Sequence, residues 1–302
     1  MSIQAEPSLT PSKSVVFLRR LVSSIGLWAL VLFGSFSGNK LVSDAVFLVI
    51  MLTCTGLGLH EFYSLTNRRG LASFRWWGIW GGVILVAGTF VLSSGRFTAP
   101  NPPAAINDLE IGFLAIFILS LLARQFFSKA NASGFVAISM TLLGFFYVPW
   151  LLNFIQKINY YPLIDGPFYV LFFILVTKCS DLGAYVVGSL VGKHKMIPRV
   201  SPGKTWEGFI GAVATSTLVS LIFAHFGQHR LAGMTVVNAI ALGLILGLSA
   251  VLGDLIESLF KREAGVKDSG RFFPGIGGIL DLLDSLLFNA PLMYLYLRYI
   301  LI

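Results

Sequence analysis

Long apolar runs alternate with short polar connections along almost the whole chain. An α-helix of about 20 residues is long enough to cross the roughly 30 Å hydrocarbon core of a bilayer. The runs lack the strict two-residue alternation of membrane β-barrel strands, and a helix satisfies its own backbone hydrogen bonds in lipid. The pattern therefore predicts an all-α fold, a polytopic membrane helical bundle with about nine transmembrane helices. They lie near residues 21–38, 41–59, 74–94, 109–127, 133–153, 163–183, 206–226, 236–258 and 280–300.

Composition and the order of the runs set the domain organisation. Hydrophobic residues make up 56% of the chain and charged residues only 12%, which excludes a soluble globular domain. The first run follows Lys13, Arg19 and Arg20, but it lacks a small-x-small cleavage site, so we expect a retained anchor rather than a signal peptide. We expect one integral membrane domain with three parts: a cytoplasmic tail (1–20), N-terminal helices (21–177) and a C-terminal catalytic region (178–302).

The basic residues predict the orientation. Alternating loops place most of the 22 Lys and Arg residues on one side of the membrane, together with the N-terminal tail. By the positive-inside rule that side is cytoplasmic, so the N-terminus is cytoplasmic and the C-terminus lies outside. The net charge of +8 is then a topology signal, and no nucleic-acid partner is expected because no basic face with interleaved aromatic residues is present. We therefore expect an integral membrane protein with its cytoplasmic face at the basic end.

Acidic residues gather near the cytoplasmic face, in the C-terminal part. Charge beside a bilayer core is costly, so such a cluster indicates a functional site. A transporter would place its site near the midplane between internal repeats, and no repeat is present. A site at one interface suits an enzyme that joins a water-soluble reactant to a lipid headgroup.

Two acidic groups are spaced for helix faces. Asp254, Glu257 and Lys261 recur at three or four residues and share one face, and Asp281 and Asp284 share another. Two helices with acids at the same depth can hold a divalent cation, and Mg²⁺ prefers a few carboxylates with water and substrate phosphates. We predict metal binding by Asp254, Asp281 and Asp284, and an ion pair for Glu257.

A second segment, SPGKTWEG from Ser201 to Gly208, is a candidate phosphate site. It resembles the end of a P-loop, but the first glycine of that motif would fall at Pro198 and no buried strand precedes it, so a P-loop is excluded. Backbone amides near Gly203 and the charge of Lys204 could still hold phosphate. The alternative is an ordinary loop in which Ser201 or Thr205 caps the next helix.

A third segment, CSDLGAYVVGSLVG, begins at Cys179. The spacing of Gly183, Gly188 and Gly192 favours close helix packing. Asp181, an acid in an apolar helix, needs a partner, which is Lys178, Lys204 or a cation.

The C-terminal motifs resemble the phosphatidate cytidylyltransferase (CDP-diacylglycerol synthase) family. Residues 258–285, SLFKREAGVKDSGRFFPGIGGILDLLDS, are similar to the long signature of that family, and DLGAY (181–185) and SPGKTWEG are similar to its upstream segments. The resemblance covers residues 178–290. Two positions depart from it: Ile276 stands where the family has histidine, and Leu282 where it has arginine.

The resemblance implies transfer of a cytidylyl group from CTP to phosphatidate, with Mg²⁺ as cofactor and a homodimer as the assembly. Whether a monovalent cation joins Mg²⁺ stays open. The implied metal ligands are Asp254 and Asp281, with Asp284 beside them and Asp181 in support. Lys204 is assigned to the CTP phosphates. The implied catalytic residues are therefore Lys204, Asp254, Asp281 and Asp284. Further substrate contacts are assigned to Ser201, Thr205, Lys261, Arg262, Lys267 and Asp268, with Arg271 a weaker candidate.

Three other functions remain open at this point. A CTP-dependent polyprenol kinase would also bring CTP to a membrane alcohol. An ion or solute transporter could use the carboxylates as cation sites. An inactive paralogue would be compatible with the changes at Ile276 and Leu282.

Overall fold

The computed structural model describes residues 13–95, 102–128, 133–270, 272 and 277–301. Ten α-helices, two π-helical turns and one small hairpin occur in this part of the chain. In chain order they are α1 (Lys13–Phe36), α2 (Lys40–Arg68), α3 (Arg75–Ser93), α4 (Pro102–Phe126), α5 (Gly134–Phe145), η1 (Phe146–Trp150), α6 (Leu151–Asn159), α7 (Gly166–Val191), β1 (Lys195–Ile197), β2 (Ser201–Thr205), α8 (Trp206–Phe226), α9 (Val236–Glu263), α10 (Ile279–Tyr296) and η2 (Leu297–Leu301).

The predicted polytopic helical membrane fold is confirmed. Among the described residues, eight helices are long and apolar enough to cross a membrane. The first predicted run falls on α1, whose apolar stretch in the described part is Ile25–Gly34. One crossing, Gly134–Asn159, comprises α5, η1 and α6. Its π-helical turn contains Pro149, which has no backbone N–H to continue the α-helical ladder.

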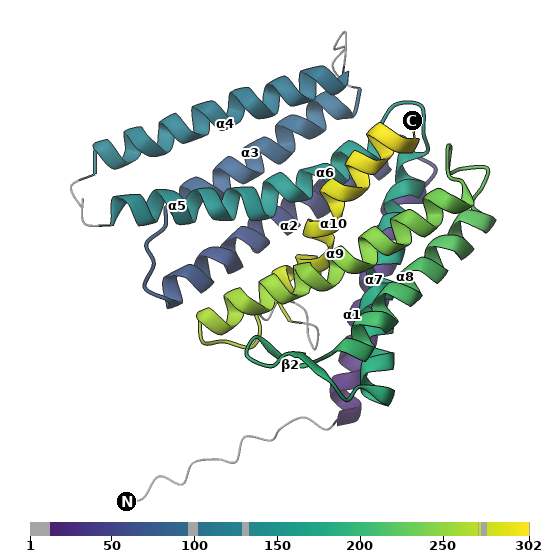
Figure 1. Ribbon diagram of the computed structural model, residues 1–302. Coiled ribbons are helices and arrows are strands. Elements are labelled where there is room, and N and C mark those ends of the chain that lie inside the picture. The colour runs from purple at the N-terminus through teal and green to yellow at the C-terminus, as the bar shows by residue number, and fades with distance from the viewer. Residues whose placement is uncertain (1–12, 96–101, 129–132, 271, 273–276, 302) are drawn as a thin grey trace, which may run out of the picture.

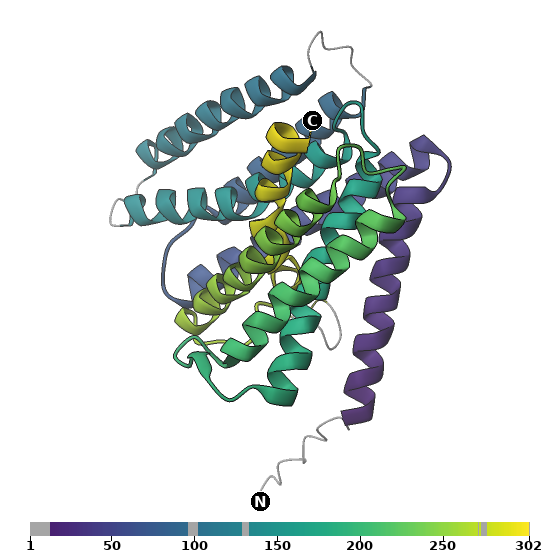
Figure 2. The same ribbon diagram turned by 45° about the vertical axis from the view of Figure 1, so that its right-hand side comes forward.

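Helix α10 lies at the centre of the bundle and carries two of the predicted site residues, Asp281 and Asp284. It packs against α9, α6, α2 and α7 (Figure 1). Helices α7, α8 and α9 stand together on one side, whereas α3, α4 and α5 form the other side, and α1 lies at the edge (Figure 2). The buried side chains of α2, α6, α7, α9 and α10 form one continuous apolar core. The acids therefore sit on well-packed helices.

The predicted close packing of the glycine-rich helix is confirmed. Gly183 of α7 faces Gly211 of α8, and a Cβ added at Gly183 would lie 2.7 Å from the Gly211 carbonyl oxygen. Such backbone contact requires residues without a side chain. Helix α7 continues to Val191, eight residues beyond the run near 163–183. Helix α2 also continues past the run near 41–59, to Arg68.

A short antiparallel hairpin connects α7 to α8. Lys195 pairs with Thr205 and Ile197 with Ser201. The hydroxyl of Thr205 accepts a hydrogen bond from the Gly208 amide, so Thr205 caps α8, one of the two roles considered for it. The hairpin lies at the same end of the bundle as the C-terminus of α9 (Figure 1).

Candidate active site

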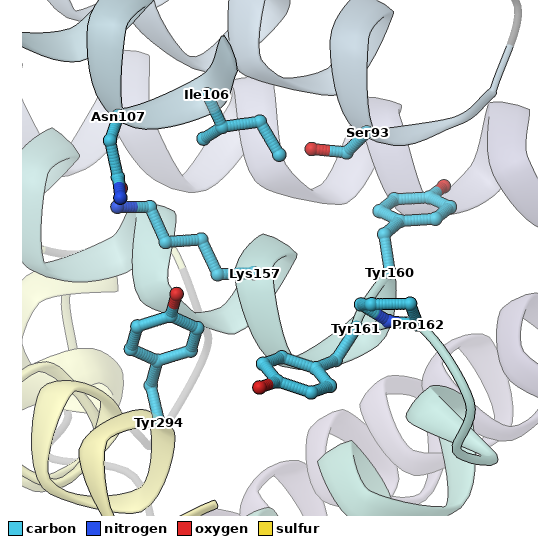
Figure 3. A pocket seen from close by; sticks show the side chains of 8 residues that line it. All are labelled: Ser93, Ile106, Asn107, Lys157, Tyr160, Tyr161, Pro162 and Tyr294. Carbon is cyan, nitrogen blue, oxygen red and sulfur yellow. The ribbon is translucent and has the colours of Figure 1, made fainter. Parts of the chain in front are cut away.

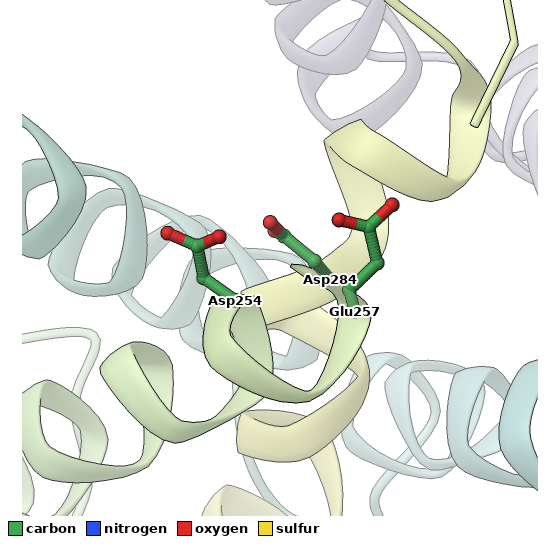
Figure 4. Close-up of side chains that lie close together, drawn as sticks. All are labelled: Asp254, Glu257 and Asp284. Atoms are coloured by element: carbon green, nitrogen blue, oxygen red, sulfur yellow. The ribbon is translucent and has the colours of Figure 1, made fainter. Parts of the chain in front are cut away.

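Three carboxylates converge where α9 crosses α10. Asp254 and Glu257 come from α9 and Asp284 from α10, and one oxygen of each lies within 4.8 Å of the other two. Figure 4 shows the three side chains on the same side of the crossing. The helices touch here because Gly253 has no side chain: a Cβ at this position would lie 2.7 Å from the Asp284 carbonyl oxygen. We refer to Asp254, Glu257 and Asp284 as the acidic triad.

The acidic triad suits a hard divalent cation. Glu257 is fully buried and Asp284 is 8% exposed. The Glu257 Oε1 atom is buried without a hydrogen-bond partner in the described part of the chain. Clustered carboxylates with little access to water repel one another and lose hydration, so a bound cation would compensate both costs. An all-oxygen donor set is the kind that Mg²⁺ accepts.

Lys178 of α7 links Asp181 to the acidic triad. Its Nζ atom lies 3.4 Å from Asp181 Oδ2 and 3.8 Å from Asp284 Oδ1. Lys178 donates to the Ser285 hydroxyl at 3.0 Å, and Ser285 donates to Asp181 Oδ2 at 3.1 Å. Of the three partners considered for Asp181, the structure provides Lys178. The Lys178 ammonium group and the Ser285 hydroxyl therefore connect Asp181 to the acidic triad.

Asp281 lies apart from the acidic triad and holds the preceding loop. Its Oδ1 atom accepts from Lys261 Nζ at 2.7 Å. Its Oδ2 atom accepts from the amide and hydroxyl of Ser269 and from the Gly278 amide, at 2.8–3.0 Å. Lys261 also forms the ion pair with Glu257 that the sequence predicted. Both oxygens of Asp281 are thus occupied, and its role as a metal ligand stays a prediction.

Glu61 of α2 is a site residue that the sequence analysis missed. It accepts hydrogen bonds from the amides of Ile279 and Leu280, at 3.0 and 2.9 Å, and from the Ser269 hydroxyl at 2.9 Å. It therefore holds both the first turn of α10 and the loop before it. The only sequence signal was an acid at the end of an apolar run, because the partners lie more than 200 residues away.

Two glycines before α10, Gly270 and Gly278, make room for Glu61. A Cβ at Gly270 would lie 2.1 Å from Glu61 Oε1, and a Cβ at Gly278 would lie 2.3 Å from Glu61 Oε2. Neither position can therefore carry a side chain while the carboxylate stays in place. These glycines serve close approach to a buried acid.

A pocket of about 420 Å³ opens beside the acidic triad. Lys204 and Ser201 of the hairpin line it together with Asp181, Asp254 and Tyr185. Lys204 Nζ lies 2.8 Å from Asp254 Oδ2, so the wall of the pocket carries an ammonium group next to a carboxylate of the acidic triad. Its volume is in the range of small-molecule sites. We call it the hairpin pocket.

The remaining predicted residues lie around the loop after α9. Arg262 donates to the carbonyl oxygens of Val200 and Val266, both at 3.2 Å, and so joins the hairpin to the loop. Lys267 and Asp268 line a second cleft, away from the hairpin pocket. Leu282 is half-buried on α10. Arg271 and Ile276 lie outside the described residues.

A separate polar cluster lies at the opposite end of the bundle. Lys157 of α6 pairs with Glu110 of α4 at 2.5 Å, and Asn153 donates to the same carboxylate at 2.6 Å. The adjoining cavity, bordered by Lys157 and Tyr294 (Figure 3), measures only about 30 Å³. That space is far smaller than the roughly 300–1,000 Å³ of typical ligand pockets, so it is too small for a nucleotide.

Fold and site together define a polytopic membrane protein with carboxylates, a lysine and a pocket at one end of its helical bundle. The chain belongs to the cytidylyltransferase family, which matches it over residues 19–300.

Similar proteins of this family come from several bacteria. A phosphatidate cytidylyltransferase of Staphylococcus saprophyticus is 40% identical over 192 residues, 64% of this chain and 71% of the relative. One of Staphylococcus haemolyticus is 38% identical over 248 residues, 82% of this chain and 89% of the relative. One of Chlamydia muridarum is 32% identical over 264 residues, 85% of each chain.

Proposed function

We propose that this protein transfers the cytidylyl group of CTP to phosphatidate, forming CDP-diacylglycerol and pyrophosphate. The family match over nearly the whole chain and the bacterial relatives support this reaction. The observation that carries it is the contact of Lys204 with Asp254, which joins a phosphate-binding cation to the acidic triad. An enzyme that joins two anionic reactants needs both features.

Asp254, Glu257 and Asp284 are the residues that would hold Mg²⁺, with Asp181 close by. When bound, Mg²⁺ neutralises charge between two anionic reactants and orients phosphoryl oxygens for in-line displacement. Lys178 sits between Asp181 and Asp284 and limits the repulsion of these acids.

The hairpin pocket is the proposed CTP site. The Lys204 ammonium group offsets the negative charge of the triphosphate and donates hydrogen bonds to it. Ser201 provides a hydroxyl on the same wall of the pocket. Thr205 fixes the start of α8 and thereby the position of Lys204. An oxygen of the lipid phosphate attacks the α-phosphorus of CTP, the bond to the β-phosphate oxygen breaks, and pyrophosphate leaves with the electron pair. The lipid phosphate is the nucleophile, so no protein nucleophile is required.

We also propose that the acidic end of the bundle faces the cytoplasm of a bacterial cell, within the inner membrane. The excess of Lys and Arg at this end supports the orientation. CTP is made and used in the cytoplasm, which agrees with it. A homodimer is expected from the resemblance alone.

The test is an assay of the purified protein in detergent with CTP, phosphatidate and Mg²⁺, beside Asp254→Asn. We expect CDP-diacylglycerol and pyrophosphate in equal amounts from the wild type, and almost none from the variant. A polyprenol kinase would instead release CDP without pyrophosphate. Cation flux in liposomes without CTP and phosphatidate would favour a transporter, and a folded but inactive wild type would favour an inactive paralogue.

A further inference from the structure

A second, larger cleft lies between α2 and the loop that follows α9. It measures about 830 Å³ and is lined by the last three turns of α2, by residues 266–270 and by Phe272. Gly270 lies directly against the Glu61 carboxylate. Nothing in the proposed reaction so far uses it. We call it the α2 cleft.

The α2 cleft gathers basic side chains from two distant parts of the chain. His60 and Arg68 come from α2 and Lys267 from the loop, and all three are exposed. No ion pair of Arg68 or Lys267 occurs within the described residues. Of the two acids on its wall, Glu61 is engaged with the first turn of α10, which leaves Asp268. The cleft therefore presents cations to an anionic ligand.

The lining is graded from apolar to basic along one helix face. Leu57, Glu61, Ser64 and Arg68 recur at intervals of four or three residues, so one face of α2 forms the wall. Leu57 lies toward the middle of the span and Arg68 at its end. Val266 and the exposed Phe272 add apolar surface from the loop. A ligand with an anionic head and an apolar tail matches this gradient.

The two substrate-sized pockets flank the acidic groups of α9 and α10. The hairpin pocket reaches them through Asp254. The α2 cleft reaches them through Ser269, which lines the cleft and donates twice to Asp281. The other basic candidates are engaged elsewhere: Lys261 with Glu257 and Asp281, and Arg262 with backbone carbonyls. Lys267 and the residues of α2 remain for a second anionic reactant.

We propose that the α2 cleft is the docking site for the phosphomonoester headgroup of the acceptor lipid, with Arg68 and Lys267 as its binding cations and His60 beside them. The inference rests on the proposed function, since that reaction needs a second anionic substrate with an apolar tail. It assigns lipid recognition to a helix of the N-terminal half, outside the signature. CTP and lipid then occupy different pockets.

The test is steady-state kinetics in mixed micelles in which the mole fraction of phosphatidate and the CTP concentration are varied separately. Arg68→Gln and Lys267→Gln are compared with Arg69→Gln, a neighbouring exposed arginine that does not line the cleft. We expect each cleft variant to raise the KM for phosphatidate about tenfold, the loss of one charge-assisted contact. The KM for CTP should stay within twofold, and Arg69→Gln should behave as the wild type.

An unchanged KM for phosphatidate in both cleft variants would overturn the proposal. A raised KM for CTP would overturn it in favour of a triphosphate site. Wild-type values of kcat at saturating lipid exclude misfolding as the cause of a raised KM.

A binding experiment without CTP tests the lipid site independently of the proposed reaction. A phosphatidate with a diazirine near its headgroup is photolysed with the wild-type protein without CTP, and labelled peptides are mapped. We expect label on the peptide that contains residues 57–68, competed by phosphatidate micelles and not by inorganic phosphate. Labelling in a protein that makes no CDP-diacylglycerol would refute the reaction and keep the site. Competition by inorganic phosphate at equal concentration, or label elsewhere only, would refute the lipid site.

Discussion

At the residue scale, Asp281 and Asp284 differ in their contacts although one turn of α10 separates them. Side chains three residues apart on an α-helix lie on the same face, about 60° apart around the axis, but at depths that differ by about 4.5 Å. That offset directs Asp284 to the acids of α9 and to Lys178, whereas Asp281 meets the donors of its own N-terminal loop. The two acids thus have different partners: Asp284 belongs to the acidic triad, and Asp281 caps the first turn of its own helix.

Asp284→Asn is expected to lower kcat/KM by at least about 100-fold at a fixed Mg²⁺ concentration, because a metal-bound carboxylate contributes several kcal/mol of charge stabilisation. The Mg²⁺ concentration for half-maximal activity should rise as well. Asp108→Asn, on an exposed acid of α4, is the matched control and should leave both values unchanged. Equal Mg²⁺ requirements in the Asp284 variant and the wild type would contradict the assignment.

The Asp281→Asn variant shows whether Asp281 binds the metal ion or positions the loop before α10. Both oxygens of Asp281 already accept hydrogen bonds from protein groups, so we expect a lower kcat with a Mg²⁺ requirement near that of the wild type. A Mg²⁺ titration of the variant measures this directly. A shift as large as that of the Asp284 variant would establish Asp281 as a ligand, as the sequence resemblance implies.

Lys204→Gln is expected to raise the KM for CTP by about tenfold or more, because one charge-assisted contact to phosphate is lost. The KM for phosphatidate should change little. Lys195→Gln is the control on the same hairpin, since Lys195 is exposed and does not line the hairpin pocket. Kinetics with CTP as the varied substrate decide the point, and a change confined to the lipid KM would argue against a nucleotide site there.

At the element scale, the start of α10 depends on a residue of α2. The first amides of a helix have no intrahelical partner, and Glu61 accepts two of them together with the Ser269 hydroxyl. We expect Glu61→Gln to destabilise the protein by about 1–3 kcal/mol, the range for loss of buried hydrogen bonds to a charged group. Hydrogen exchange should rise at residues 277–281 in particular. Glu263→Gln, on the exposed end of α9, should leave exchange there unchanged.

The contact of α7 with α8 gives a matched glycine pair. Gly183→Ala places a Cβ against the Gly211 carbonyl and Thr215, so we expect overpacking to cost about 1–3 kcal/mol and to lower Tm in detergent. Gly112→Ala on α4 meets no heavy atom within 4 Å and should be neutral or slightly stabilising. Equal Tm values for the two variants would show that the glycine contact adds little.

How far the sequence predicted these elements depended on the range of the interaction. Hydropathy located the helices, and three- and four-residue spacing placed Asp254 and Glu257 on one face, because both patterns are local. The joining of α9 to α10 at Gly253 and the reach of Glu61 to Leu280 depend on tertiary packing, which no local pattern encodes. The end of α2 was underestimated because polar residues such as Glu61 and Thr66 interrupt the apolar run although they are buried within the bundle.

At the scale of the whole molecule, both proposed pockets and the hairpin lie at one end of the bundle, and the Glu110–Lys157 pair lies at the other. Helix α10 runs between them and packs on both halves of the chain. The division at residue 178 stays a prediction. In the proposed reaction the hairpin pocket belongs to the C-terminal half, whereas the α2 cleft needs residues of both halves, so neither half should act alone.

The orientation of the molecule is tested by cysteine accessibility. Lys193, in the connection after α7, and His229, in the connection after α8, are exposed and separated by one crossing. If the acidic end is cytoplasmic, a membrane-impermeant maleimide should label His229→Cys in spheroplasts and Lys193→Cys only in inverted vesicles. The wild type is the control, because its two cysteines, Cys54 and Cys179, lie within α2 and α7. The reverse labelling pattern would place the acidic triad outside, where CTP is absent, and would remove the basis of the proposed reaction in the cell.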